Sequence, residues 1–136
     1  MSEKIKELAE ELDVSVDDIE ESDYDDCLFD VGNAEYLVLT DEEADQKVRD
    51  YIEESVWAFN AWFIIEHSDL PFEAEEMIKG FQESKCESAN ETILALIKDF
   101  DEFVEDAISA DGRGHFLATY DGDEIETESF FIYRVN

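Results

Sequence analysis

Basic residues are scarce in this sequence: nine lysines and arginines stand against forty aspartates and glutamates, which leaves a formal charge of −31. This balance argues against direct binding of nucleic acid, whose phosphate backbone is recognised by lysine and arginine. It also repels phosphorylated substrates. A small domain needs a net charge of only about 2–8 for solubility, and self-repulsion opposes the compact state. The surplus therefore indicates a requirement that lies outside the fold.

Long apolar segments are also absent. The longest apolar run, Val56 to Ile65, contains Asn60 and falls short of the roughly 20 residues that a membrane helix needs. The N-terminal residues show no apolar signal segment. The two cysteines, Cys27 and Cys86, lack metal-type spacing and are expected to be reduced thiols. We therefore expect a cytoplasmic protein that does not associate with membranes.

Motifs of enzymatic chemistry are missing as well. The sequence contains no phosphate-binding loop, nucleophile elbow or zinc-type spacing, and its acidic clusters do not fit the calcium-loop pattern. His115 lies close in sequence to Asp111 and Asp121, which suggests an acid–base couple, although a plain strand residue is the simpler interpretation. We expect no enzyme, no metal and no cofactor. Calcium-dependent melting, or turnover that depends on His115, would support the opposite view.

Apolar residues are plentiful despite the charge. They make up 44% of the chain and include ten phenylalanines, whereas acidic disordered segments are poor in aromatic residues. A length of 136 residues suits one domain. We therefore expect residues 1–136 to form a single folded acidic domain.

Hydrophobic spacing and turn signals predict the elements of this domain. The predicted helices cover residues 3–12, 40–67, 71–84 and 90–110. The predicted strands form two hairpins, one from 27–31 and 35–39 and one from 115–120 and 129–135. The fold class that follows is α+β: a small antiparallel sheet of two hairpins packed against a long central helix and several shorter helices.

Local signals fix several of these boundaries. Ser15 is a typical N-cap, and Thr40 followed by Glu43 forms a capping box. Gly32-Asn33 is a typical two-residue hairpin turn. The aromatic half of the helix predicted over 40–67 is apolar nearly all round, so its rings are expected in the core or in a dimer interface. These rings are Trp57, Phe59, Trp62 and Phe63.

The acids of the helix predicted over 90–110 are unusually placed. They crowd its C-terminal half, where the helix dipole disfavours anions by about 0.3–1 kcal/mol each. Like charges also recur four residues apart, at a further cost of about 0.2–0.5 kcal/mol per pair. Acids chosen only for solvation could avoid both costs, so the pattern favours selection for a negative surface.

Two stretches carry a resemblance to a protein family. They are Tyr36-Leu37-Val38-Leu39-Thr40-Asp41-Glu42-Glu43-Ala44-Asp45, and Ala107 to Leu117 continuing through Tyr120-Asp121-Gly122 to Ile132-Tyr133-Arg134. The sequence resembles, from about Val31 to the C-terminus, small acidic uncharacterised proteins of phages and prophages. The resemblance implies a phage origin and carries no activity. In charge and size alone, the chain is also similar to phage DNA-mimic inhibitors such as anti-restriction and anti-CRISPR proteins.

These observations lead to one hypothesis and two alternatives. We expect a phage-type DNA mimic that blocks the nucleic-acid groove of a basic host defence protein, with steering by opposite charge. The first alternative is an acidic interaction module that binds a basic phage or host protein without imitating DNA, and for which a homodimer through its aromatic residues is one possible form. The second is adaptation to high salt. The acids expected to contact the partner are Glu20, Glu21, Asp23, Asp25, Asp26, Asp99, Glu102 and Asp106.

Overall fold

The computed structural model describes residues 2–136, and its helices and five-stranded antiparallel sheet make the chain an α+β protein, as the sequence predicted. Packing divides the chain into two compact units. The first combines residues 1–48 with residues 111–136, of which Met1 lies outside the described part. The second comprises residues 49–110. That residues 1–136 form a single domain stays a prediction.

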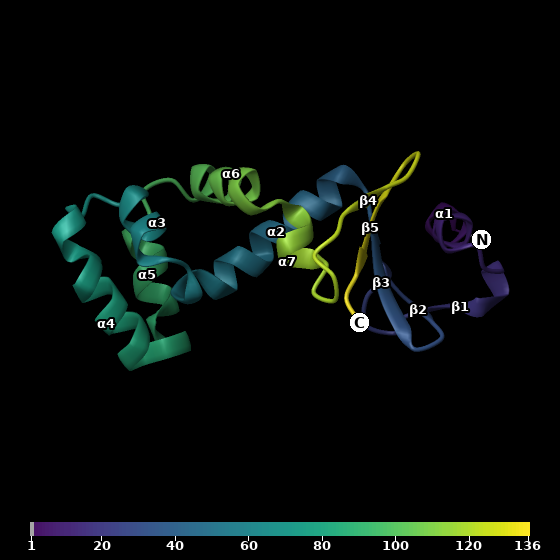
Figure 1. Ribbon diagram of the computed structural model, residues 1–136, viewed down its shortest axis with the longest axis horizontal. Coiled ribbons are helices and arrows are strands. Elements are labelled where there is room, and N and C mark those ends of the chain that lie inside the picture. The colour runs from purple at the N-terminus through teal and green to yellow at the C-terminus, as the bar shows by residue number, and fades with distance from the viewer. Residues whose placement is uncertain (1) are drawn as a thin grey trace. The chain divides into compact units, whose positions relative to one another are not determined.

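The sheet belongs to the first unit (Figure 1). Its strands lie in the order β1-β2-β3-β5-β4. The predicted turn Gly32-Asn33 joins β2 to β3, with Val31 opposite Ala34 and Gly32 at a φ of 63° that favours glycine. The first predicted hairpin is thus confirmed. The strands are β1 (Ile19–Glu21), β2 (Leu28–Val31), β3 (Ala34–Leu39), β4 (Ile125–Glu126) and β5 (Phe131–Arg134).

Helix α1 (Glu3–Leu12) covers one face of this sheet, and its predicted bounds are confirmed. The side chain of Ser2 caps it by accepting a hydrogen bond from the Ile5 amide. Leu8 and Ala9 of α1 pack on alternate residues of β3, Tyr36 and Val38, because successive side chains of a strand point to opposite faces. This packing forms the core of the first unit around α1.

The prediction of a single helix over 40–67 is wrong. Helix α2 (Asp41–Ser55) ends before the aromatic run, a 3₁₀ turn follows at Val56–Ala58, and α3 (Ala61–Glu66) begins anew. Asn60 caps α3 by accepting a hydrogen bond from the Trp62 amide. At the break, the Gln82 side chain donates to the carbonyls of Trp57 at 2.9 Å and Phe59 at 2.6 Å. These bonds satisfy backbone groups that an ended helix leaves without partners.

The helix predicted over 90–110 is also two helices, α5 (Asn90–Leu96) and α6 (Phe100–Asp111). Asp99 stands before α6 and accepts a hydrogen bond from the Glu102 amide at 3.2 Å, as an N-cap does. The helix predicted over 71–84 is observed as a 3₁₀ turn at Phe72–Ala74 and α4 (Glu75–Lys85), followed by a second such turn at Cys86–Ala89.

The prediction of a strand over 115–120 is wrong, because residues 115–117 belong to α7 (Arg113–Leu117) and residues 118–120 form no strand. Gly112, at a φ of 82°, starts this helix, and α7 packs against β5 with Phe116 and Leu117 buried. The strand that pairs with β5 at the sheet edge is the short β4 instead. The second hairpin therefore exists, with a different first strand.

Candidate acidic interaction site

The acidic residues stay at the surface throughout the described part of the chain. None of the forty is buried, and only six are half-buried: Glu7, Asp25, Asp30, Glu35, Glu43 and Glu75. Seven of the nine basic residues already hold an acid in an ion pair: Lys4, Lys6, Lys47, Arg49, Lys79, Lys98 and Arg113. The scarce positive charge is thus largely neutralised within the fold, and the excess negative charge faces solvent.

The acids predicted near β1 do not share one face. Glu20 and Glu21 are consecutive residues of the edge strand β1, so their side chains point to opposite sides of the sheet. Asp23 and Asp26, in the loop to β2, are exposed. Asp25 has a structural role, because it accepts hydrogen bonds from Lys47 Nζ at 2.7 Å and from the Cys27 amide at 2.8 Å. The structure therefore does not assemble this predicted group into one surface.

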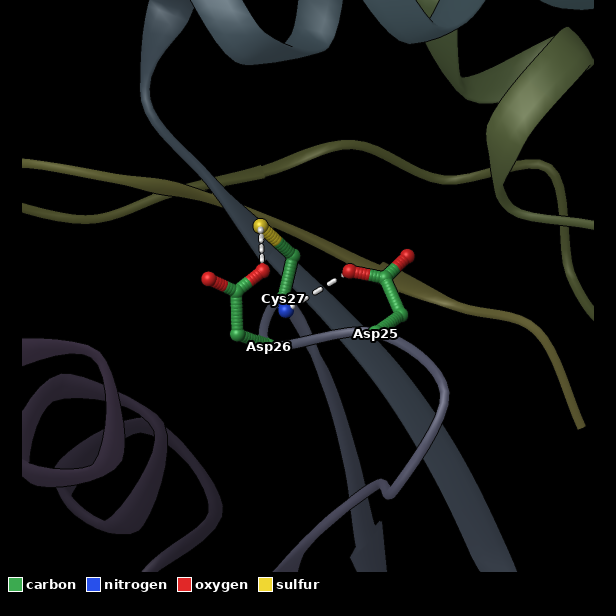
Figure 2. Close-up of side chains that lie close together, drawn as sticks. All are labelled: Asp25, Asp26 and Cys27. Carbon is green, nitrogen blue, oxygen red and sulfur yellow. Dashed lines mark hydrogen bonds between the residues drawn. The ribbon is translucent and has the colours of Figure 1, made fainter.

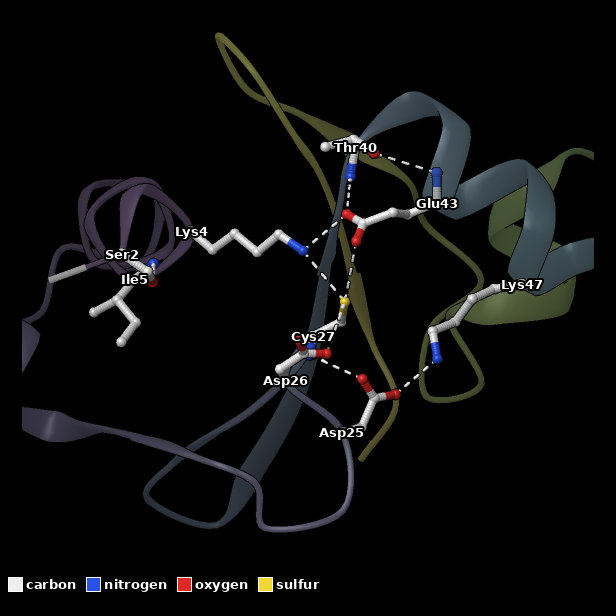
Figure 3. Close-up of polar contacts among 9 residues, drawn as sticks. All are labelled: Ser2, Lys4, Ile5, Asp25, Asp26, Cys27, Thr40, Glu43 and Lys47. Atoms are coloured by element: carbon white, nitrogen blue, oxygen red, sulfur yellow. Dashed lines mark hydrogen bonds and ion pairs between the residues drawn. The ribbon is translucent and has the colours of Figure 1, made fainter.

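Asp25, Asp26 and Cys27 offer ligand atoms that lie within 4.8 Å of one another, a separation at which they could hold a metal ion (Figure 2). Figure 3 shows that ammonium groups already approach this cluster from α1 and α2. Lys4 Nζ lies 3.2 Å from Cys27 Sγ, and Lys47 Nζ binds Asp25. Lys47 therefore compensates Asp25, and Lys4 bonds the Cys27 thiol, so two of the three residues already have a partner other than a metal ion.

Glu43 joins this cluster to the start of α2 (Figure 3). Its Oε1 accepts hydrogen bonds from Lys4 Nζ at 2.8 Å and from the Thr40 amide at 2.9 Å, while its own amide donates to Thr40 Oγ1 at 3.2 Å. The predicted capping box is thus confirmed. Partial burial alone would raise the pKa of Glu43, but the bonds from Lys4 and Thr40 outweigh it and lower the pKa to about 2.

Replacing Glu43 with glutamine is expected to lower the free energy of unfolding by about 1–2 kcal/mol at neutral pH, a value reduced for the solvent exposure of the ion pair. Glutamine keeps the cap, so the loss reports the charge. Because the folded pKa lies below the unfolded value of 4.5, the stabilisation is complete above that pH. It disappears as the pH falls from 4.5 towards 2.

Urea unfolding of the wild type and of Glu43→Gln at several pH values would measure the difference between their free energies of unfolding. The neighbouring exposed acid is the matched control, since Glu42→Gln removes the same charge from the same helical turn. If this difference in free energy stays constant between neutral pH and pH 2, the lowered pKa of Glu43 is wrong.

The three acids predicted on the last helix do come together, around a pocket of about 280 Å³ in the second unit. Glu102 and Asp106 share one face of α6, since residues four apart are neighbours on a helix, and Asp99 precedes this helix as its N-cap. The end of α3 and the residues before α6 complete the wall. The lining residues are Glu66, His67, Ser68, Lys98, Asp99, Glu102 and Asp106.

His67 is the one buried member of this pocket, and sequence reasoning missed its role. Its Nε2 lies 3.1 Å from Asp106 Oδ2, and its side chain is only 8% exposed. The ring packs against Phe63 and Phe103, with centroids 5.0 and 5.1 Å away. Its carbonyl accepts a hydrogen bond from the Lys98 amide at 2.9 Å. The histidine thus ties the end of α3 to α6, and the pairing reflects a tertiary contact that no local pattern signals.

The bounds of α6 correct the electrostatic interpretation of its acids. Because the helix begins at Phe100, Asp99, Asp101 and Glu102 lie at its N-terminus, where the dipole stabilises anions. The predicted dipole penalty therefore does not apply to these three residues. Asp101 is also neutralised by an ion pair with Arg49. The placement of these acids no longer requires an external cause, whereas their convergence on one pocket stands as an observation.

The four aromatic residues predicted for the core or a dimer interface have different environments. Phe59 and Phe63 both contact Phe103, with ring centroids 5.2 and 4.8 Å away, so they belong to the packing of the second unit. Trp57 is half-buried at the break after α2. Trp62 is 45% exposed. No observation bears on a homodimer.

Comparisons with known proteins add no assignment: the chain matches no protein-family model, no curated protein and no solved structure. The resemblance to phage proteins therefore stays a prediction. No helix within residues 2–136 combines the length and the apolar character needed to cross a membrane.

Proposed function

We propose that the protein is an acidic inhibitor that occupies the nucleic-acid-binding groove of a basic host protein, as a DNA mimic of the anti-restriction or anti-CRISPR type. The observation that carries the proposal is the convergence of Asp99, Glu102 and Asp106 on one exposed pocket. Phosphate-binding grooves present lysine and arginine side chains. Carboxylates that gather on one surface can take the place of phosphates there.

The spacing of these carboxylates is compatible with that role. At about 1.5 Å of rise per residue, the three acids span roughly 10 Å of the α6 axis, or about one charge every 5 Å. One strand of duplex DNA carries a charge about every 3.4 Å along its axis. Glu66, at the end of α3, adds a fourth carboxylate to the pocket lining. The local charge density therefore approaches that of a single phosphate strand.

A competition experiment tests the proposal. The immobilised protein is exposed to bacterial lysate at low salt, and bound proteins are eluted with duplex DNA. We expect DNA-binding proteins to elute, since DNA and its mimic compete for one groove, and we expect capture to weaken with added salt. If bound proteins stay in place in excess DNA, mimicry is wrong and the acidic interaction module is favoured.

Neutralising the pocket acids should weaken this capture. The combined variant Asp99→Asn, Glu102→Gln and Asp106→Asn is expected to bind an eluted partner about tenfold more weakly, or about 1.4 kcal/mol. The matched control removes three exposed acids elsewhere in the same unit, with Glu83→Gln, Glu87→Gln and Glu91→Gln. Equal losses in both variants, measured by titration calorimetry, would show that total charge matters and the pocket does not.

A further inference from the structure

Trp62 and Phe72 form an exposed pair of stacked rings in the second unit. Their centroids lie 4.6 Å apart with an interplanar angle of 26°. Trp62 is 45% exposed and Phe72 is 58% exposed. Large aromatic residues normally bury most of their surface. Single exposed side chains are common, whereas exposed apolar side chains that lie together mark interaction sites. Trp62 and Phe72, called the ring pair below, are therefore candidates for a binding contact.

The local structure explains why the rings face outward. Helix α3 buries Ala61, Ile64 and Ile65 against the rest of the unit. Trp62 lies on the other side of this short helix, and Phe72 follows in the 3₁₀ turn before α4. The two segments contact one another, so the rings stack across the α3–α4 connection. The core does not need them, because the buried positions of α3 are already filled.

Carboxylates flank both rings. Glu66 lies four residues after Trp62 in α3, a separation that places their side chains side by side on the helix, and Glu76 lies in the first turn of α4, directly after the 3₁₀ turn that carries Phe72. Both glutamates are exposed. Glu66 also lines the pocket with Glu102 and Asp106. Glu66 is therefore a helical neighbour of Trp62 and at the same time a lining residue of the pocket.

We infer that the ring pair, with Glu66 and Glu76, is the contact centre for arginine side chains of a basic protein partner. A guanidinium group stacks on aromatic faces and binds carboxylates with two parallel hydrogen bonds, whereas a lysine ammonium is a compact point charge. A second copy of this chain fits the surface poorly, because it would oppose acids to acids. The inference rests on the proposed function, and it names arginine as the chemistry that this surface selects.

The test uses the full chain and two labelled peptides of equal length, one of arginine only and one of lysine only. Fluorescence anisotropy at fixed salt gives both dissociation constants. We expect the wild type to prefer the arginine peptide by about tenfold. The double variant Trp62→Ala with Phe72→Ala should lose this preference because it has no aromatic faces at this site. It should still bind both peptides, and bind them alike, because its net charge is unchanged. Tyr24→Ala is the matched control, because Tyr24 is an aromatic residue that is 97% exposed and belongs to the first unit.

A second double variant, Trp62→Leu with Phe72→Leu, keeps apolar bulk without aromatic faces. It should lose the arginine preference in the same way, and it replaces the alanine variant if that variant does not fold. Equal affinity of the wild type for both peptides would overturn the inference, as would an arginine preference that survives in either folded variant. Sedimentation must show that the wild type is monomeric, and a dimer that the variants abolish would instead assign the rings to self-association. Loss of arginine selectivity is independent of competition by DNA, so the two proposals fail separately.

Discussion

Replacing Arg113 with alanine is expected to destabilise the first unit by about 2 kcal/mol, below the range for breaking a buried ion pair because Asp41 and Asp45 are largely exposed. The Arg113 side chain is 10% exposed, and its Nη1 lies 2.8 Å from Asp41 Oδ1 and 3.0 Å from Asp45 Oδ1. Its Nε lies 2.9 Å from Glu124 Oε2. The guanidinium also stacks over Phe131, at 4.5 Å from the ring centroid.

The loss has two physical parts. Without the guanidinium, Asp41, Asp45 and Glu124 are left as neighbouring like charges, and this repulsion is strongest at low salt. The contacts between α7, the start of α2 and the segment before β4 are lost as well. We expect added sodium chloride to recover part of the deficit. Arg113→Lys should fall between the wild type and alanine, because lysine cannot reproduce the planar fork of donors.

Chemical unfolding measures this prediction, and Arg49→Ala is the matched control. Arg49 pairs with Asp101 and stacks on Phe100 in the second unit. Because Asp101 is 75% exposed and Arg49 is 37% exposed, removal of this ion pair should cost at most about 1 kcal/mol. If Arg113→Ala costs no more than Arg49→Ala, the Arg113 network does not hold the first unit together.

The long-range contacts of Arg113 illustrate which features of the fold the sequence could not predict. Signals that act over a few residues were reliable: the Gly32-Asn33 turn and the Thr40–Glu43 capping box are both observed. Helix α7 was predicted as a strand because its placement depends on acids more than sixty residues away in sequence, Asp41 and Asp45. Tertiary contacts of this kind override local propensity.

The helix breaks were missed for another reason. Apolar spacing continues through Val56 to Ile65 and through residues 90–110, so periodicity alone cannot locate the ends. The signals that could have located the helix breaks are polar residues inside those runs. Asn60 and Asp99 both cap the helices that follow them, and an acid three residues before Glu102 matches the usual start of a helix.

The candidate site was predictable only where helical spacing decides it. Glu102 and Asp106 share a face because of their separation along α6, Asp99 caps the start of the same helix, and the structure brings all three to one pocket. The group from Glu20 to Asp26 is dispersed because it lies on a strand and a loop. Glu66, His67 and the ring pair reach the same unit through the packing of α3, which no local pattern in the sequence specifies.

Replacing Gly114 with alanine is expected to destabilise the first unit by about 2–3 kcal/mol, as overpacking against rigid backbone does. A Cβ at this position would lie 2.5 Å from the carbonyl oxygen of Gly122 and 3.1 Å from the backbone of Asp123. Both contacts are with main chain. The segment cannot easily withdraw, because the Gly122 amide donates to the Ala118 carbonyl, which closes the loop onto α7.

The matched control is the glycine inside α4, since a Cβ at Gly80 would meet nothing within 4 Å. Gly80→Ala should stabilise the protein by about 0.5–1 kcal/mol, because alanine favours a helix interior. Opposite signs for the two substitutions in urea unfolding would confirm that α7 needs a glycine for close approach. A neutral Gly114→Ala would contradict the close approach of α7 to the loop before β4.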